Sequence, residues 1–228
     1  MNPQRRSVRD GDDESSETLL TDGGPTRRTV LASVGGATTI GVAGCLSGDG
    51  RDCSGEQRRT EVPARGDPDA PITVDYYRDF SCSGCAAYEA RVAPFVASNY
   101  VDPEIVRYEA HDFPIIDEWS WKIPNAAYAV FEETDLSTHT EFVTGVFDLR
   151  GNYSTESIAE FAAELGASSE TVTAALEDEP YCQQVVDGRE EASDRGVDST
   201  PTVYVNDRKL EGEEINDIDA VIESERSD

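Results

Sequence analysis

The chain has 228 residues, of which 37% are hydrophobic, and this is enough apolar material for a domain with a substantial core. Its 47 acidic and 19 basic residues give a formal net charge of −28. This balance excludes a basic nucleic-acid-binding surface, because a strongly acidic protein repels phosphate.

The first part of the chain has the pattern of an export signal. A polar segment is followed by Arg27-Arg28 and by a weakly apolar run that ends in Val42-Ala43-Gly44-Cys45. The arginine pair resembles a twin-arginine signal, and the small residues before Cys45 resemble a lipobox. We therefore expect a twin-arginine lipoprotein signal peptide at 1–44 and a lipidated Cys45 that anchors the protein to the outer face of the cell membrane. An ordinary cleaved signal, or an uncleaved helix with an incidental cysteine, is the alternative.

The segment after the signal is polar and contains glycine. We expect a linker at 45–62, with at most a short strand near 59–63. Alternating β-branched and aromatic residues then predict strands over 72–78 and 104–110, and an apolar face predicts a helix over 86–100. Pro94 is expected to kink that helix.

Two cysteines, Cys82 and Cys85, stand between the first of these strands and the helix. The first turn of a helix offers unpaired N–H groups and a partial positive charge, and both stabilise a thiolate. Cys82 is therefore the expected nucleophile, and Cys85, one turn later on the same face, can form a disulfide with it. The spacing predicts a redox pair, although two such thiols could also bind Cu(I) or Zn(II).

The sequence from 118 to 195 is helical in pattern and is interrupted by Gly, Ser, Asp and Pro. The predicted helices lie near 123–134, 139–149, 154–165, 168–177 and 182–195. A β-hairpin follows at 202–206 and 209–212, and the last helix lies near 215–224. This order of elements predicts an α/β fold with an inserted helical domain.

Several motifs together resemble one family. They are Gly66–Pro71 before a strand, Asp79–Cys85, the helical Pro94, Asp112–Pro114 after the next strand, and Gly196–Asn206. This set resembles the DsbA-like thiol-disulfide oxidoreductases, which have a thioredoxin fold interrupted by a helical domain. The resemblance implies a DsbA-like domain at 63–228, with thioredoxin parts at 63–117 and 196–228 and the helical insertion at 118–195. It implies an enzyme that uses no cofactor and no metal.

The resemblance also implies an arrangement for the site. In that family the proline that matches Pro201 is cis and faces the disulfide, and the residue that matches Thr200 contacts the thiols. Ser83 and Gly84, between the two cysteines, complete the expected support of the site. A cis turn would leave backbone groups beside Thr200 free to pair with an extended substrate segment, whereas a plain trans turn before a strand is the alternative.

The chain departs from the family pattern in two places, at Tyr76 and at Ser83-Gly84. Many members have a carboxylate six residues before the first cysteine, where this chain has Tyr76, and the neighbouring Asp75 is expected on the other face of the strand. Either Asp75 reaches the site through an altered register or water carries the proton. Ser83-Gly84 replaces the Pro-His of strongly oxidising members, and this change removes a potential cation that would stabilise the Cys82 thiolate.

The two remaining cysteines, Cys53 and Cys182, allow two interpretations. Cysteines outside the cell tend to pair, which favours a structural disulfide between them. Cys53 lies in the predicted linker, however, and a large distance from Cys182 would leave both as free thiols.

We expect an extracytoplasmic enzyme in which Cys82 forms a mixed disulfide with a cysteine-containing exported protein and Cys85 resolves it. A separate redox partner would restore the pair, and the location favours disulfide formation over reduction or isomerisation. One alternative is a copper or zinc handling module that uses Cys82 and Cys85. Such a module needs a third ligand, and neither His111 nor His139 has an obvious route to the pair. A non-catalytic binding or assembly protein is a further alternative.

The acidic residues are spread over the whole chain, and lysine occurs only at Lys122 and Lys209. This composition resembles that of proteins from extremely salt-loving microbes, although a generic acidic protein is the alternative. At molar salt the Debye length is roughly 3 Å, so repulsion between the carboxylates is screened. We therefore expect the protein to unfold partly in low salt.

Overall fold

The computed structural model describes residues 51–227 and contains one mixed sheet with the strand order β1-β3-β2-β4-β5. The strands are β1 (Ala64–Arg65), β2 (Ile72–Arg78), β3 (Val106–Asp112), β4 (Thr202–Val205) and β5 (Arg208–Glu211). Strands β2 and β3 are parallel, and the other neighbouring pairs are antiparallel. The central strand β2 has the bounds that the sequence predicts. Because β2 and β3 are parallel, their carboxyl ends lie at the same edge of the sheet.

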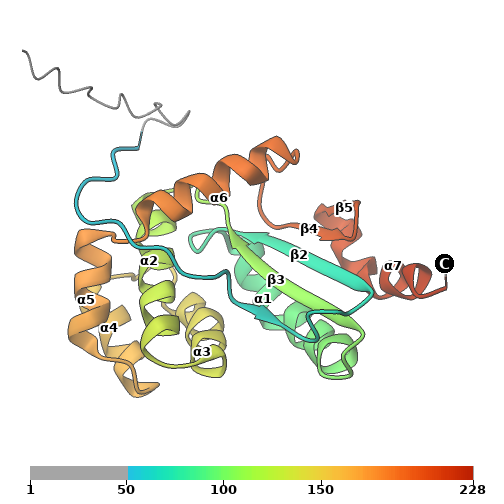
Figure 1. Cartoon of the computed structure of the whole chain (residues 1–228), viewed down its shortest axis with the longest axis horizontal. Coiled ribbons are helices and arrows are strands. Elements are labelled where there is room, and N and C mark those ends of the chain that lie inside the picture. Colours follow the sequence, from blue (N-terminus) through green and yellow to red (C-terminus); the bar gives the residue numbers. More distant parts are fainter. Residues whose placement is uncertain (1–50, 228) are drawn as a thin grey trace, which may run out of the picture. The chain divides into compact units, whose positions relative to one another are not determined.

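The helices lie between and after these strands (Figure 1). They are α1 (Ser83–Val96), α2 (Glu118–Glu133), α3 (Leu136–Val146), α4 (Thr155–Glu164), α5 (Ser169–Asp178), α6 (Cys182–Asp194) and α7 (Ile218–Glu225). Figure 1 shows α2 to α5 grouped beside the sheet, with α6 leading back to β4. The block from α2 to α6 is thus inserted between β3 and β4, as predicted. Within residues 51–227, no helix has the length and apolar character that a membrane span requires.

The side chains of β2 alternate between two packed faces of the sheet. On one face the ring of Tyr76 stacks on that of Tyr88 in α1, with ring centroids 4.0 Å apart. On the other face Asp75 and Tyr77 bind Arg195, at the end of α6, at 2.6 and 2.9 Å. The sheet therefore has α1 on one side and α6 on the other, and both faces of β2 are buried.

Helices α1, α2 and α3 begin at least three residues earlier than their apolar patterns predict, because a side chain caps each N-terminus. Helix α1 begins at Ser83 rather than near 86, and Cys82 is its N-cap residue. Helix α2 begins at Glu118 rather than near 123, since the Asp117 carboxylate accepts hydrogen bonds from the N–H groups of Trp119 and Ser120. Helix α1 ends at Val96, and a π-helix (Ala97–Val101) continues it just after Pro94.

The short strand expected near 59–63 is absent, and β1 begins at Ala64 instead. The backbone before β1 uses its hydrogen-bonding groups on the helical insertion. The Arg58 N–H donates to the Pro180 carbonyl oxygen at 2.6 Å, and the Thr60 N–H donates to the Gln184 side-chain oxygen at 2.9 Å. Residues 51–63, which we call the N-terminal strap, therefore lie along the start of α6 and cannot pair with the sheet.

The N-terminal strap is also covalently bound to the insertion. A disulfide joins Cys53 to Cys182, the first residue of α6, across a sequence separation of 129 residues. Around this bond, Arg51 forms an ion pair with Glu179, and its guanidinium lies 4.5 Å from the centre of the Trp121 ring. Of the two interpretations that the sequence allows for these cysteines, the structure has the disulfide.

Candidate active site

Cys82 and Cys85, the two free thiols among residues 51–227, lie at the N-terminus of α1, in the turn that follows β2. The turn is closed by a hydrogen bond from the Cys82 N–H to the Asp79 carbonyl oxygen at 3.0 Å. The Sγ of Cys82 accepts a hydrogen bond from the Cys85 N–H at 3.4 Å. The first thiol therefore caps the helix, where N–H groups and the helix dipole favour negative charge.

The two thiols differ in exposure and in acidity. Cys82 is 8% exposed, whereas Cys85 is fully buried. The hydrogen bond from the Cys85 thiol, with smaller contributions from Thr200 and the backbone N–H groups of Gly84 and Cys85, overcomes burial and lowers the pKa of Cys82 to about 5. Burial, followed by the hydrogen bond to Cys82, raises the pKa of Cys85 well above its ordinary value. Cys82 is thus a thiolate at neutral pH, and Cys85 is a protonated thiol.

The turn before β4 lies directly opposite the thiols. The Thr200–Pro201 peptide bond is cis, as the resemblance implies. The Sγ of Cys82 lies 3.3 Å from the Thr200 carbonyl oxygen, to which it donates a hydrogen bond when protonated. A Cβ atom on Gly84 would lie 2.8 Å from Cδ of Pro201, so a glycine is needed here, while Ser83 beside it is exposed. The structure therefore brings all six predicted active-site residues together.

Asp79 is a buried residue of the site that the sequence does not identify. Its Oδ1 accepts hydrogen bonds from the Ser81 N–H and the Ser120 hydroxyl, both at 2.7 Å. Its Oδ2 accepts from the N–H groups of Ile115 and Ile116 at 2.7 and 3.2 Å. Burial raises the pKa of Asp79 despite these bonds. One carboxyl group thus connects the cysteine turn to the start of the helical insertion.

Asp75 does not reach the thiols. It lies on the opposite face of β2, where His111 contacts it at 3.2 Å and Arg195 at 2.6 Å. Burial favours a higher pKa for Asp75, but its hydrogen bonds to His111 and Arg195 outweigh burial and lower the pKa. The register of β2 is regular, so the altered register that could have brought Asp75 to the site does not occur. Tyr76 is the residue of β2 that faces Cys85, and it is fully buried.

Neither of the predicted candidates, His111 and His139, is placed to act as a third metal ligand for the two thiols. Within residues 51–227, one group of three potential ligands is close enough to hold an ion: Asp75, Glu109 and His111. This group excludes both thiols, and its carboxylates pair with Arg195 and Arg107, each at 2.6 Å. His139 is buried beside Phe131, and burial lowers its pKa to about 3. We interpret the group as an ion-pair network.

Cys45 and the expected signal peptide at 1–44 lie outside the residues that the structure describes. The export and lipidation expectations therefore remain predictions from the sequence.

The sequence of this chain is similar to those of known proteins. A family model described as thioredoxin matches residues 59–224. Disulfide bond formation protein D of Bacillus subtilis is 24% identical in an alignment 179 residues long, which covers 75% of this chain and 80% of that protein.

Solved structures are similar over the same region. Oxidised BdbD of Bacillus subtilis aligns with a TM-score of 0.66 and 21% identity, over 78% of this chain and 100% of that one. DsbA of Chlamydia trachomatis aligns with a TM-score of 0.67 and 20% identity, over 75% of this chain and 94% of that one. These likenesses confirm the predicted fold, an α/β thioredoxin fold with a helical insertion.

Proposed function

The chain belongs to the thioredoxin family, and from this premise we propose that it is an extracytoplasmic thiol-disulfide oxidoreductase that forms disulfides in exported proteins through Cys82 and Cys85. The names of its relatives, a disulfide bond formation protein and a DsbA, agree with the expected class of enzyme, an oxidoreductase. One observation carries the proposal. A thiol that is 8% exposed and has a pKa of about 5 lies beside a fully buried thiol whose pKa is raised.

This pair of pKa values suits thiol-disulfide exchange. In the oxidised enzyme, a substrate thiolate attacks Sγ of Cys82, the Cys82–Cys85 bond breaks, and Cys85 leaves with the electron pair and takes up a proton. A second substrate thiolate attacks the substrate sulfur of the mixed disulfide and releases Cys82. Because Cys82 is stable as a thiolate, it is a good leaving group. The substrate is oxidised to a disulfide, and the enzyme is reduced to the dithiol.

The surroundings of Cys82 fit an extended protein substrate. The cis turn at Thr200–Pro201 presents backbone groups beside the thiol, and an extended segment can pair with such groups. Ile115 and Ile116 are 43% and 52% exposed, and their N–H groups bind Asp79 next to the cysteine turn. Exposed apolar side chains at this place can contact the substrate around its reacting cysteine.

The proposal includes the location and the domain division. A twin-arginine lipoprotein signal at 1–44 would export the protein, and a lipid on Cys45 would hold it at the outer face of the cell membrane. Residues 45–62 would then connect the anchor to the DsbA-like domain at 63–228. A redox partner would reoxidise the dithiol. The net charge of −28 supports a salt-loving source, in which molar salt screens the carboxylates.

Trapping variants test this function in cells at high salt. In Cys85→Ser, the Cys82 thiolate can still attack a disulfide of an exported protein and form a mixed disulfide, and the variant has no second active-site thiol to attack that bond. Exported proteins should therefore accumulate on Cys82 as adducts that reductant releases. Cys82→Ser is the matched control and should trap none. Wild-type protein should also oxidise a reduced, unfolded protein substrate at equilibrium with a glutathione buffer.

The competing metal-handling function predicts another result. Absence of adducts from Cys85→Ser, together with a stoichiometric Cu(I) or Zn(II) content in the wild type, would refute the oxidoreductase. Mass spectrometry of the membrane fraction tests the anchor separately, and a mature protein with an unmodified Cys45 contradicts the lipoprotein proposal.

A further inference from the structure

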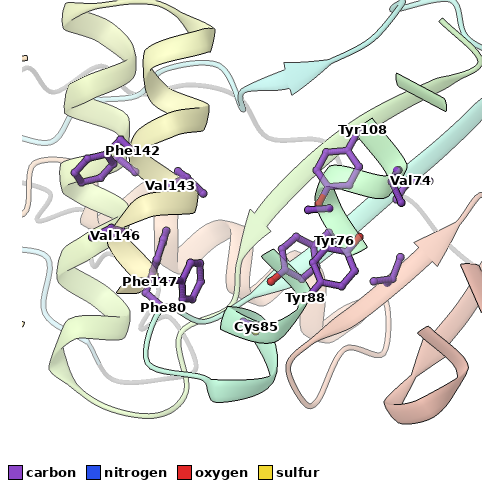
Figure 2. Close-up of a cluster of buried hydrophobic side chains, with 14 of the residues drawn as sticks. Val74, Tyr76, Phe80, Cys85, Tyr88, Tyr108, Phe142, Val143, Val146 and Phe147 are labelled. Carbon is purple, nitrogen blue, oxygen red and sulfur yellow. The ribbon is translucent and has the colours of Figure 1, made fainter. Parts of the chain in front are cut away.

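Three tyrosine hydroxyls are buried without a regular hydrogen-bond partner on the face of the sheet that packs against α1. They belong to Tyr76 in β2, Tyr88 in α1 and Tyr108 in β3. Figure 2 shows the rings of Tyr76 and Tyr88 side by side near Cys85. Since a phenylalanine would fill the position of Tyr76 without burying an unpaired hydroxyl, packing alone does not account for the tyrosine.

The buried hydroxyl of Tyr76 has no regular hydrogen-bond partner among residues 51–227, and Figure 2 shows its ring near Cys85. Hydrogen bonding from Tyr76 works to lower the pKa of Cys85, against the larger effect of burial, and a charge on Cys85 in turn disfavours ionisation of Tyr76. The backbone N–H of Asp79 is 3.4 Å from the same sulfur. Two donors thus face the atom on which negative charge develops when the disulfide opens.

The other side chains that influence Tyr76 and Cys85 cannot take the place of the two donors to the Cys85 sulfur. Tyr76 is also faced by Glu89 of α1 and by the phenols of Tyr88 and Tyr108, all of which oppose its ionisation. Cys85 is faced by Cys82, whose hydrogen bond and charge both raise the pKa of the buried thiol. The guanidinium of Arg78 also interacts electrostatically with Tyr76, but it donates its hydrogen bond to Asp112 at 2.9 Å and pairs with Glu89. A neutral hydroxyl is therefore the side-chain donor that the buried thiolate can use.

We propose that Tyr76 is a catalytic residue, which stabilises the Cys85 thiolate by a hydrogen bond during thiol-disulfide exchange. Its hydroxyl is held in place by the stacked ring of Tyr88, so the donor is positioned before the charge forms. This role rests on the proposed function, but it concerns a step that can be measured without a protein substrate.

The Tyr76 hydroxyl acts when the disulfide between Cys82 and Cys85 opens. When a substrate thiolate attacks Cys82, the bond between the two enzyme sulfurs breaks and the electron pair stays on Sγ of Cys85. The Tyr76 hydroxyl donates to that anion without losing its proton. Cys85 then takes up from the solvent the proton that the substrate thiol released on ionising. In the reverse step the same bond stabilises Cys85 as it loses its proton and attacks the mixed disulfide.

Reaction of the reduced protein with the aromatic disulfide DTNB in molar KCl separates the two thiols. Cys82 attacks first and releases one thionitrobenzoate anion, and attack by Cys85 on Cys82 releases the second. Stopped-flow absorbance then gives both rates as a function of pH. We compare wild type with Tyr76→Phe and with the matched control Tyr108→Phe, which removes another buried, unpartnered hydroxyl from the neighbouring strand β3.

Tyr76→Phe should slow the second release about 10- to 100-fold at neutral pH and should move the pH profile of this release to higher pH. The cause is the loss of one charge-assisted hydrogen bond. The first release should be unchanged, and Tyr108→Phe should match wild type in both. An unchanged second release in Tyr76→Phe overturns the inference, and so does equal slowing of both releases, which indicates a structural effect.

Failure of the proposed function gives a different result. A wild-type protein that completes both releases but does not oxidise a reduced protein substrate would refute the function and leave the role of Tyr76 in disulfide closure intact.

Discussion

Gly84 and Pro201 are in direct contact across the active site, and a Cβ atom on Gly84 would lie 2.8 Å from Cδ of Pro201. Carbon atoms that are not bonded do not approach so closely, and the proline ring has no free end that could move aside. The absence of a side chain at position 84 therefore allows the turn that contains Thr200 to contact Cys82.

Gly84→Ala should separate that turn from the thiols. We expect a loss of about 1–3 kcal/mol in the free energy of unfolding, which is typical of overpacking, and a slower reaction of the oxidised protein with reduced substrates. Urea unfolding in molar KCl measures the first effect. Gly188→Ala is the control, because a Cβ at this position in α6 meets nothing within 4 Å. If both variants behave alike, the contact has no effect.

Cys82 should react as a thiolate down to mildly acidic pH. With a pKa of about 5, its alkylation rate should be half-maximal near pH 5, whereas an ordinary thiol reaches that point near about 8.5. Because the hydrogen bond from Cys85 is the largest cause, Cys85→Ala should move the midpoint of alkylation upwards. A midpoint that stays unchanged would mean that the helix N-terminus alone lowers the pKa.

The same low pKa makes the stability of the reduced protein depend on pH. The pKa of Cys82 is lower in the folded state than in the unfolded state, so the thiolate stabilises the folded protein fully above the unfolded pKa. This contribution is lost as the pH falls through about 5. The oxidised protein has no such thiol. The stability of the reduced form relative to the oxidised form should therefore decrease on acidification from pH 8 to pH 4, as measured by urea unfolding of each form.

Asp79 should matter for both the active-site turn and the insertion. Asp79→Asn keeps the shape of the side chain but replaces one accepting oxygen with a donor, and it leaves a buried N–H or hydroxyl partner unsatisfied. We expect a destabilisation of about 1–3 kcal/mol, measured by urea unfolding in molar KCl. Asp148→Asn, at an exposed carboxylate in the insertion, should change the stability by less than about 0.5 kcal/mol. Equal effects at the two positions would contradict the connecting role of Asp79.

The contrast between these residues shows which parts of the site could be predicted from the sequence. The position of Cys82 at the start of a helix depends on neighbouring residues, and a strand followed by two spaced cysteines is sufficient to predict it. The partners of Asp79 lie 36 and 41 residues further along the chain, at Ile115 and Ser120. Only the folded insertion brings them to Asp79, so no local pattern identifies the residue.

The N-terminal strap could not be predicted for a related reason. Its composition is that of a linker, because its polar groups bind the surface of the insertion instead of filling a core. Its order depends on a disulfide and on hydrogen bonds from Arg58 and Thr60 to residues more than one hundred positions away. For Tyr76, by contrast, the strand alternation alone places its side chain opposite Asp75, on the face that packs against α1.

Removal of the disulfide by Cys53→Ala and Cys182→Ala should release the N-terminal strap. The bond closes a loop of 129 residues in sequence, and loss of such a cross-link typically costs about 2–5 kcal/mol. Urea unfolding in molar KCl measures the change, and the active-site thiols should keep their reactivity with DTNB. Undiminished stability of the double variant would show that the strap is held by its noncovalent contacts alone.

The net charge should make folding depend on salt. Because 47 acidic residues face 19 basic ones, repulsion in dilute buffer opposes the compact state, and molar salt screens it. We expect the melting temperature to rise markedly between dilute buffer and molar KCl. Sucrose at equal osmolality is the control, since it does not screen charge, and a melting temperature that is the same in dilute buffer and molar KCl would contradict a salt-adapted protein.

The disulfide at Cys53 also fixes how far the active site can reach. If Cys45 carries the lipid, seven residues separate it from Cys53. The eight steps between the two Cα atoms, at about 3.5 Å each, span at most about 28 Å in a fully extended tether. The bond to Cys182 at the start of α6 then attaches this tether to the insertion. The enzyme would work only on chains that are close to the membrane surface, where newly exported proteins emerge.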